Sequence, residues 1–155
     1  MARTDYYHDP NAPTPNSIVV AVTAYITNAD GHLLLIRRTD NDLYSIPGGA
    51  LDVGETLTQT VMREVKEETG IDVEVTGLVG IYSDPGHVIA YTDGEVRQEF
   101  SICFRAGVVG GTLRTSDESK EVGWHPVDSL GDLNMHPTIR LRIQHGSQNQ
   151  APYFT

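Results

Sequence analysis

Cysteine is almost missing from this chain, which has Cys103 alone among its 155 residues. A single cysteine cannot close an internal disulfide, as expected for a protein of the reducing cytoplasm. Long apolar runs are missing as well. No window reaches the roughly 18 residues that a membrane span requires, and residues 1–15 hold no apolar stretch of signal-peptide length. We therefore expect a soluble, cytoplasmic chain with no membrane partner.

Positive charge is scarce too. The chain has 11 lysines and arginines against 21 aspartates and glutamates, a formal net charge of -10. Such a balance repels nucleic acid backbones and anionic membranes, and no basic stretch offsets it. A small anionic substrate stays compatible with this charge where cations bridge it to the protein. We expect a small-molecule partner and no nucleic acid.

The length and composition fit one globular domain. Residues 1–16 contain three prolines and many polar residues, which predicts an extended or loosely ordered N-terminal arm. Residues 17–147 form the predicted domain, and residues 148–155 a polar C-terminal tail. No repeat or linker divides the chain further.

Apolar alternation and turn residues predict the elements. Strands are expected at 17–26, 32–38, 43–46, 72–83, 87–92, 95–106, 108–113 and 121–125, with helical segments at 126–133 and 136–145. Asp-Gly pairs at 30–31 and 93–94 indicate two hairpins. Strands joined mostly by hairpins, with helices on the faces, predict an α+β fold or a mixed sandwich.

The clearest element is a helix between Gly54 and Gly70. Thr56 and Gln59 fit a capping box at its start, where a hydroxyl and an amide satisfy free backbone N–H groups. Gly70 stands where a left-handed glycine ends a helix. Nothing between these signals breaks the helix.

Three glutamates share one face of that helix. At about 100° per residue, Glu64, Glu67 and Glu68 fall within an arc of roughly 100°. Like charges so placed repel one another, whereas Mg²⁺ or Mn²⁺ would bind their oxygens. Leu57 and Val61 lie in the same arc and should face the core, so the carboxylates should sit at the edge of buried surface.

The loop before the helix adds a second signal. Pro47-Gly48-Gly49 lets backbone approach a ligand with no side chain in the way. A run such as EVKEE is by itself usually a solvated helix face, and Pro-Gly-Gly by itself is usually a turn. The two signals gain meaning from their spacing.

That spacing resembles the signature of the Nudix family. The signature is Gly, five residues, Glu, seven residues, then Arg-Glu-aliphatic-any-Glu-Glu-any-Gly-aliphatic. Here Gly49 precedes ALDVG, Glu55 precedes TLTQTVM, and residues 63–71 read REVKEETGI. Every specified position is met over 49–71. The resemblance implies a Nudix-like α/β/α sandwich with a central mixed sheet and a loop-helix-loop catalytic motif.

The resemblance also implies roles. Glu64, Glu67 and Glu68 would be metal ligands for Mg²⁺ (or Mn²⁺), with the Gly48 carbonyl as a further ligand. A second group would be structural: Gly49, Glu55, Arg63 and Gly70, with Arg63 and Glu55 holding the loop to the helix. The activity implied is hydrolysis of a phosphate anhydride by a pyrophosphohydrolase, with water activated by the bound cations.

The identity of the general base, the group that takes a proton from the attacking water, stays open. Glu67, Glu68 and Glu64 are candidates within the motif, and Glu118 lies in a later loop where some relatives place a glutamate that reaches the metals. Glu121 and Glu99 are rivals. The six histidines show no metal-ligand spacing, so we expect them to be surface or hydrogen-bonded residues. Cys103 is expected in the core.

The motif does not determine the substrate, because the residues that would contact its base and sugar lie outside the motif. Tyr44 and Tyr82 could stack on a base or pack in the sheet. Pro85 follows the motif near the interval at which ADP-ribose hydrolases of the family carry a proline, though one residue short of it. We expect ADP-ribose or a nucleotide sugar. The alternatives are an (oxidised) nucleoside triphosphate and, as a different class, a non-catalytic nucleotide-sensing module. Relatives are often homodimers.

Overall fold

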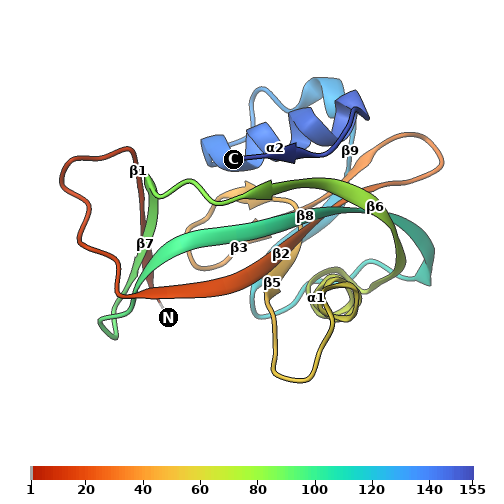
Figure 1. The fold of residues 1–155 in the computed structure, drawn as a ribbon. Coiled ribbons are helices and arrows are strands. Elements are labelled where there is room, and N and C mark those ends of the chain that lie inside the picture. The colour runs from red at the N-terminus through yellow and green to blue at the C-terminus, as the bar shows by residue number, and fades with distance from the viewer. Residues whose placement is uncertain (1) are drawn as a thin grey trace.

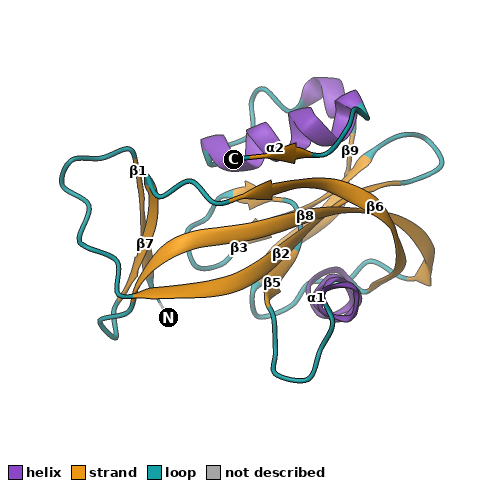
Figure 2. Ribbon diagram, viewed as in Figure 1, coloured by secondary structure: helices purple, strands orange, loops and turns teal. Residues whose placement is uncertain are grey.

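The computed structural model describes residues 2–155, which form three layers. Figure 1 shows helices α1 (Leu57–Thr69) and α2 (Pro137–Gln148) on opposite faces of a twisted mixed sheet. The strands are β1 (Arg3–Tyr7), β2 (Ser17–Thr27), β3 (Leu33–Arg38), β4 (Tyr44–Ser45), β5 (Gly48–Ala50), β6 (Ile71–Tyr82), β7 (His87–Tyr91), β8 (Val96–Gly111), β9 (Ser119–His125) and β10 (Tyr153–Phe154). Among the described residues the strands form one sheet, coloured orange in Figure 2. The expected α/β/α sandwich is confirmed.

Strands β2 and β8 form the centre of the sheet. They run parallel and stay in register from the Ser17–Arg97 pair to the Thr27–Gly107 pair. Because neighbouring side chains of a strand point to opposite faces, β2 supplies both hydrophobic cores. Ala24 packs with the apolar side of α1, and Tyr25 packs with the core beneath α2.

Two strand predictions need correction. The first hairpin pairs only at Thr27 and Leu33, after which β3 leaves β2 and pairs with β9. The segments expected at 95–106 and 108–113 are one strand, β8. Gly107 does not interrupt it, because β6 pairs with the backbone on both sides of that glycine. In both cases the strand is determined by pairing with a strand that is distant in the sequence, β9 for β3 and β6 for β8.

Both ends of the chain add strands that the sequence pattern did not indicate. Within the predicted arm, β1 pairs antiparallel with β7, and within the predicted tail, β10 pairs parallel with β6. An exposed sheet edge offers unpaired backbone groups that a nearby segment can satisfy. The division into arm, domain and tail stays a prediction. No helix among residues 2–155 is long and apolar enough to cross a membrane.

Helix α1 begins and ends where its sequence predicts. Thr56 accepts a bond from the backbone N–H of Gln59, and the Gln59 side chain accepts one from the Thr56 backbone, so the capping box is confirmed. Gly70 has a φ of 80°, and its N–H donates to the Lys66 carbonyl. A Cβ on Gly70 would also lie 2.1 Å from the Thr112 carbonyl oxygen, so the packing there admits only glycine.

Candidate active site

A cavity of about 520 Å³ opens on the α2 side of the sheet. Its walls come from the central strands, from the loop around β5, from the loop before β9 and from the start of α2. Among the lining residues are Thr23, Ser101, Glu64, Glu118 and Arg142. This volume is in the range of ligand-binding sites in proteins.

Three carboxylates gather beside this cavity. Glu64 and Glu68 of α1 are buried, with 8% and 3% of their surface exposed, while Glu118 comes from the exposed loop before β9. One oxygen of each carboxylate lies within 4.8 Å of the others. The sequence placed the first two on one helix face, and the fold adds the third from about fifty residues away.

The electrostatics of this carboxylate cluster favour a cation. Burial is the main cause that raises the pKa of Glu68 to about 8, although the Gly48 N–H donates to its Oε1 at 2.8 Å. Burial also raises the pKa of Glu64, and bonding to Arg63 opposes that shift. An all-oxygen donor set suits Mg²⁺ or Mn²⁺. These residues therefore fit a divalent cation, which would relieve the repulsion among them.

Gly49 lets the loop lie directly against this cluster. A Cβ built on Gly49 would sit 2.4 Å from the Glu64 carboxylate, a distance that real Cβ contacts do not reach. The neighbouring Gly48 is as tightly placed, since its Cβ would lie 2.1 Å from the Val22 carbonyl oxygen. The glycine pair is thus required by close approach to the glutamate on one side and to β2 on the other.

Arg63 joins the loop to the helix. Its Nε and Nη2 donate to the two oxygens of Glu55 at 2.7 and 2.9 Å, and Nη2 also donates to the Ala50 carbonyl at 3.1 Å. Its Nη1 donates to Glu64 at 2.9 Å. Bonding to Arg63 is the main cause that lowers the pKa of Glu55 to about 2. One guanidinium therefore fixes the loop and orients a cluster carboxylate.

The other proposed acids lie outside the carboxylate cluster of Glu64, Glu68 and Glu118. Glu67 is 59% exposed and faces Arg63 at 3.3 Å, outside the cluster of Glu64, Glu68 and Glu118. Its role as a ligand stays a prediction. Glu121 pairs with Arg37 at 3.0 Å. Glu99 lines the cavity without belonging to the cluster.

The three residues suggested for substrate binding differ in their position relative to the cavity. Tyr44 lines the cavity and is half-buried. Tyr82 is 6% exposed and packs against Tyr153 and the guanidinium of Arg142. Pro85 is exposed in the loop before β7 and does not line the cavity. Of the three, only Tyr44 faces the space beside the carboxylates.

Sequence reasoning missed another set of cavity residues. Among residues 2–155, buried side-chain atoms without a hydrogen-bond partner occur on Thr23, Ser101 and Arg142, and all three residues line the cavity. Unsatisfied buried polar atoms are costly unless a ligand or water bonds them. The sequence offered one signal for this set, which is that Arg142 stands between the apolar residues Leu141 and Ile143 of the C-terminal helix. Cys103, by contrast, is a core residue, and burial raises its pKa to about 11.

Comparison with known proteins places this geometry in a family. A family model described as the NUDIX domain matches residues 18–145. The chain belongs to the Nudix family. The match covers the glycine loop, α1 and the loop that carries Glu118, so the resemblance drawn from residues 49–71 is confirmed. The protein is a Nudix hydrolase.

Individual relatives agree with this assignment. A MutT-like protein of Streptomyces ambofaciens is 40% identical over 142 residues, which are 92% of this chain and 85% of that protein. An ADP-ribose pyrophosphatase of Methanocaldococcus jannaschii is 37% identical over 116 residues, which are 70% of this chain and 62% of that protein. The crystal structure of a MutT protein from Methanosarcina mazei Go1 superposes with a TM-score of 0.70 at 26% identity, covering 90% of this chain and 100% of that one.

Proposed function

We propose that this Nudix hydrolase cleaves the phosphate anhydride of a nucleoside diphosphate-linked compound, ADP-ribose or a nucleotide sugar, with Mg²⁺ or Mn²⁺ as the cofactor. The observation that carries the proposal is the convergence of Glu64, Glu68 and Glu118 beside a cavity of about 520 Å³. The name of the ADP-ribose pyrophosphatase at 37% identity supports the substrate class.

The chain's own residues have distinct tasks in this proposal. Glu64 and Glu68 would hold the cation together with the Gly48 carbonyl, Glu67 would complete the set from the exposed side of α1, and Glu118 would lie beside it. When bound, the divalent cation neutralises charge on the phosphate oxygens and makes a water more acidic. Arg63 keeps the loop and Glu64 aligned throughout, so little reorganisation is needed when substrate enters.

Glu118 is our choice for the group that takes the proton from the attacking water. It is the exposed member of the cluster, so a proton accepted on its carboxylate can pass to bulk solvent. The buried Glu68 lacks that exit, and Glu67 lies outside the cluster. A base role for Glu118 predicts that Glu118→Gln lowers kcat more than it raises KM, as steady-state kinetics with Mg²⁺ would measure.

A substrate panel tests the proposal. ADP-ribose, UDP-glucose, dGTP and 8-oxo-dGTP are each incubated with Mg²⁺ or Mn²⁺, and the products are identified by chromatography and mass. We expect the highest kcat/KM with a diphosphate-linked compound and release of a nucleoside monophosphate. Pyrophosphate release from a triphosphate at higher kcat/KM would replace our substrate class with the alternative. Nucleotide binding without turnover under either metal would indicate a sensing module.

A further inference from the structure

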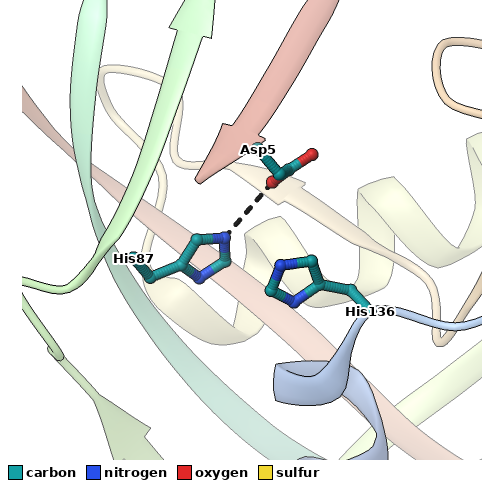
Figure 3. Close-up of side chains that lie close together, drawn as sticks. All are labelled: Asp5, His87 and His136. Carbon is teal, nitrogen blue, oxygen red and sulfur yellow. Dashed lines mark hydrogen bonds and ion pairs between the residues drawn. The ribbon is translucent and has the colours of Figure 1, made fainter. Parts of the chain in front are cut away.

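A second cluster of metal-ligating side chains lies apart from the glutamates. Asp5 of β1, His87 of β7 and His136, the residue before α2, each offer one ligand atom, and these atoms lie within 4.8 Å of one another. Figure 3 shows a nitrogen of each ring turned toward the Asp5 carboxylate, so the three groups face a common space. Neither histidine has a sequence neighbour that indicates a site, which is why spacing alone gave no signal.

The distances within this Asp-His-His cluster suit one ion. His87 Nε2 is 3.2 Å from Asp5 Oδ1, and the two imidazole rings are nearly parallel, at 11°, with centroids 4.6 Å apart. Ligand atoms about 2.1 Å from a tetrahedral ion lie roughly 3.4 Å from one another. The spacing of the first pair is therefore close to what coordination requires. Because the lone pairs lie in the ring planes, one imidazole must turn out of the stack for both rings to bind one ion.

Two of the ligands have orienting partners of the kind that accompany metal sites. Arg3 donates to both oxygens of Asp5, at 2.8 and 3.1 Å, and fixes the plane of its carboxylate. Without an ion, Nδ1 of His136 accepts from the Thr138 backbone N–H at 3.2 Å and caps the start of α2, so Nε2 carries the proton of the neutral ring. Coordination through Nε2 would move the ring proton to Nδ1, where the Thr138 hydroxyl, 2.8 Å away, can accept it, and the cap bond would be given up.

The donor set decides which ion fits. Two imidazole nitrogens and one carboxylate favour a borderline transition metal such as Zn²⁺ over Mg²⁺, which prefers oxygen ligands only. Arg3 already offsets part of the Asp5 charge, so the ion must gain most of its binding from the nitrogens. His87 and His136 line the cavity that Glu64 also lines, which leaves room for a fourth ligand from that side.

We propose that Asp5, His87 and His136 form a second metal site, for a divalent transition-metal ion of the Zn²⁺ class, with an open coordination position facing the substrate cavity. The ion would tie β1 to β7 and to the start of α2. The proposal does not depend on the substrate assigned above, because its ligands share no residue with the carboxylate cluster.

Cobalt titration of the full-length, chelator-treated protein tests the site. Co²⁺ is added in the presence of millimolar Mg²⁺, so that the carboxylate cluster is occupied, and the visible absorption of Co²⁺ is followed. We expect one equivalent of Co²⁺ to give an intense band typical of four-coordination, and Zn²⁺ to remove it. Absence of a band, or a band that Mg²⁺ abolishes, would overturn the proposal.

Variants assign the ligands. His87→Gln and His136→Gln should each weaken Co²⁺ binding by at least about tenfold, whereas His32→Gln, which changes a histidine outside the cluster, should not. Glu68→Gln should also leave the band intact, since it alters only the carboxylate cluster. Equal binding by the His87 and His32 variants would refute the assignment.

A measurement on the unaltered protein guards against variants that fail to fold. Zn²⁺ at one equivalent should slow amide hydrogen exchange in β1, because the ion joins that strand to two other elements. Mg²⁺ should not slow it. Exchange in β1 that is indifferent to Zn²⁺ would count against the site even if every variant were unstable.

Discussion

At the scale of single residues, Arg63 has more partners than any role in charge balance requires. It bonds Glu55, the Ala50 carbonyl and Glu64 through the fixed fork of one guanidinium. A lysine would keep the charge but offers one ammonium, which cannot reach all three groups at once. The geometry of the site therefore depends on the shape of this side chain and not only on its sign.

Arg63→Lys should lower the free energy of unfolding by about 1–2 kcal/mol, because charged hydrogen bonds to the loop are lost. It should also raise the Mg²⁺ concentration needed for half-maximal activity, since Glu64 is no longer oriented. Urea unfolding and a metal titration of the rate measure the two effects. Lys66→Arg, a reversed exchange on the same helix, is the control. A variant with unchanged metal dependence would show that Arg63 acts on stability alone.

Glu67 gives a second prediction at this scale. Glu67→Gln should reduce turnover by at least about a hundredfold while the fold survives, as expected for loss of a carboxylate that acts on the bound cation. Steady-state kinetics and thermal melting check the rate and the fold. Glu74→Gln, at an exposed position of β6, should change neither. A near-normal rate in the Glu67 variant would reject its assignment as a ligand.

The raised pKa of Glu68 predicts how the stability of the metal-free protein depends on pH. Its pKa in the folded state is raised from 4.5 to about 8, so folding favours the protonated form. The stability that this carboxyl contributes is therefore fully present below about pH 4.5 and is lost as the pH rises through about 8. Urea unfolding with a chelator should show a falling free energy across that range. Glu68→Gln should flatten the slope, and a steep slope in that variant would assign it to other groups.

At the scale of elements, the residues that begin and end α1 are distinct from the glutamates that α1 contributes to the carboxylate cluster. Its caps, Thr56 and Gly70, lie at the two ends, while Glu64 and Glu68 occupy the middle turns. Val61 and Val65 anchor the same helix in the hydrophobic core between α1 and the sheet. The helix can thus lose a cap without displacing its carboxylates, because side-chain packing holds the central turns.

Thr56→Ala tests that separation. Loss of the cap should cost about 1 kcal/mol of stability, with kcat and KM unchanged within about twofold because the middle turns are held by packing. Thermal melting and steady-state kinetics with Mg²⁺ measure both. Thr92→Ala, at an exposed position of the turn between β7 and β8, serves as the control. A large fall in kcat in the Thr56 variant would mean that the helix start is coupled to the site.

At the scale of the whole molecule, the cavity is closed by elements from both ends of the chain. Strand β1 brings Arg3 to the wall, and α2 brings His136 and Arg142. The carboxylates belong to other elements, α1 and the loop before β9. The residues proposed to enclose the substrate and those proposed to act on it therefore come from different parts of the fold.

Removal of residues 1–8 should separate the two functions. The deletion leaves the edge of β7 unpaired and opens the cavity, so we expect lower thermal stability and a KM raised several-fold, with kcat kept because the glutamates stay in place. Kinetics with Mg²⁺ alone avoid any contribution from the second metal site. A chain that begins at Arg3 keeps the strand and is the control. Loss of kcat with an unchanged KM would contradict this division.

The sequence predicted the local features of this fold well. Thr56, Gly70 and the turn at Gly31 were readable because caps and turns depend on neighbouring residues. The pairing of β1 with β7 and the union of two segments into β8 were not, because sheet edges find partners far away in the chain. The same limit hid the approach of His87 to His136, which stand about fifty residues apart.

The sequence by itself determined the family, the helix and the face on which Glu64 and Glu68 lie, since a helix of fixed period converts spacing into direction. Only the tertiary structure decided that Glu118 joins those two carboxylates, that Glu67 stays outside the cluster, and that Asp5 meets two histidines. The physical reason is that a helical turn is set by local backbone geometry, whereas contacts between elements depend on how distant surfaces pack.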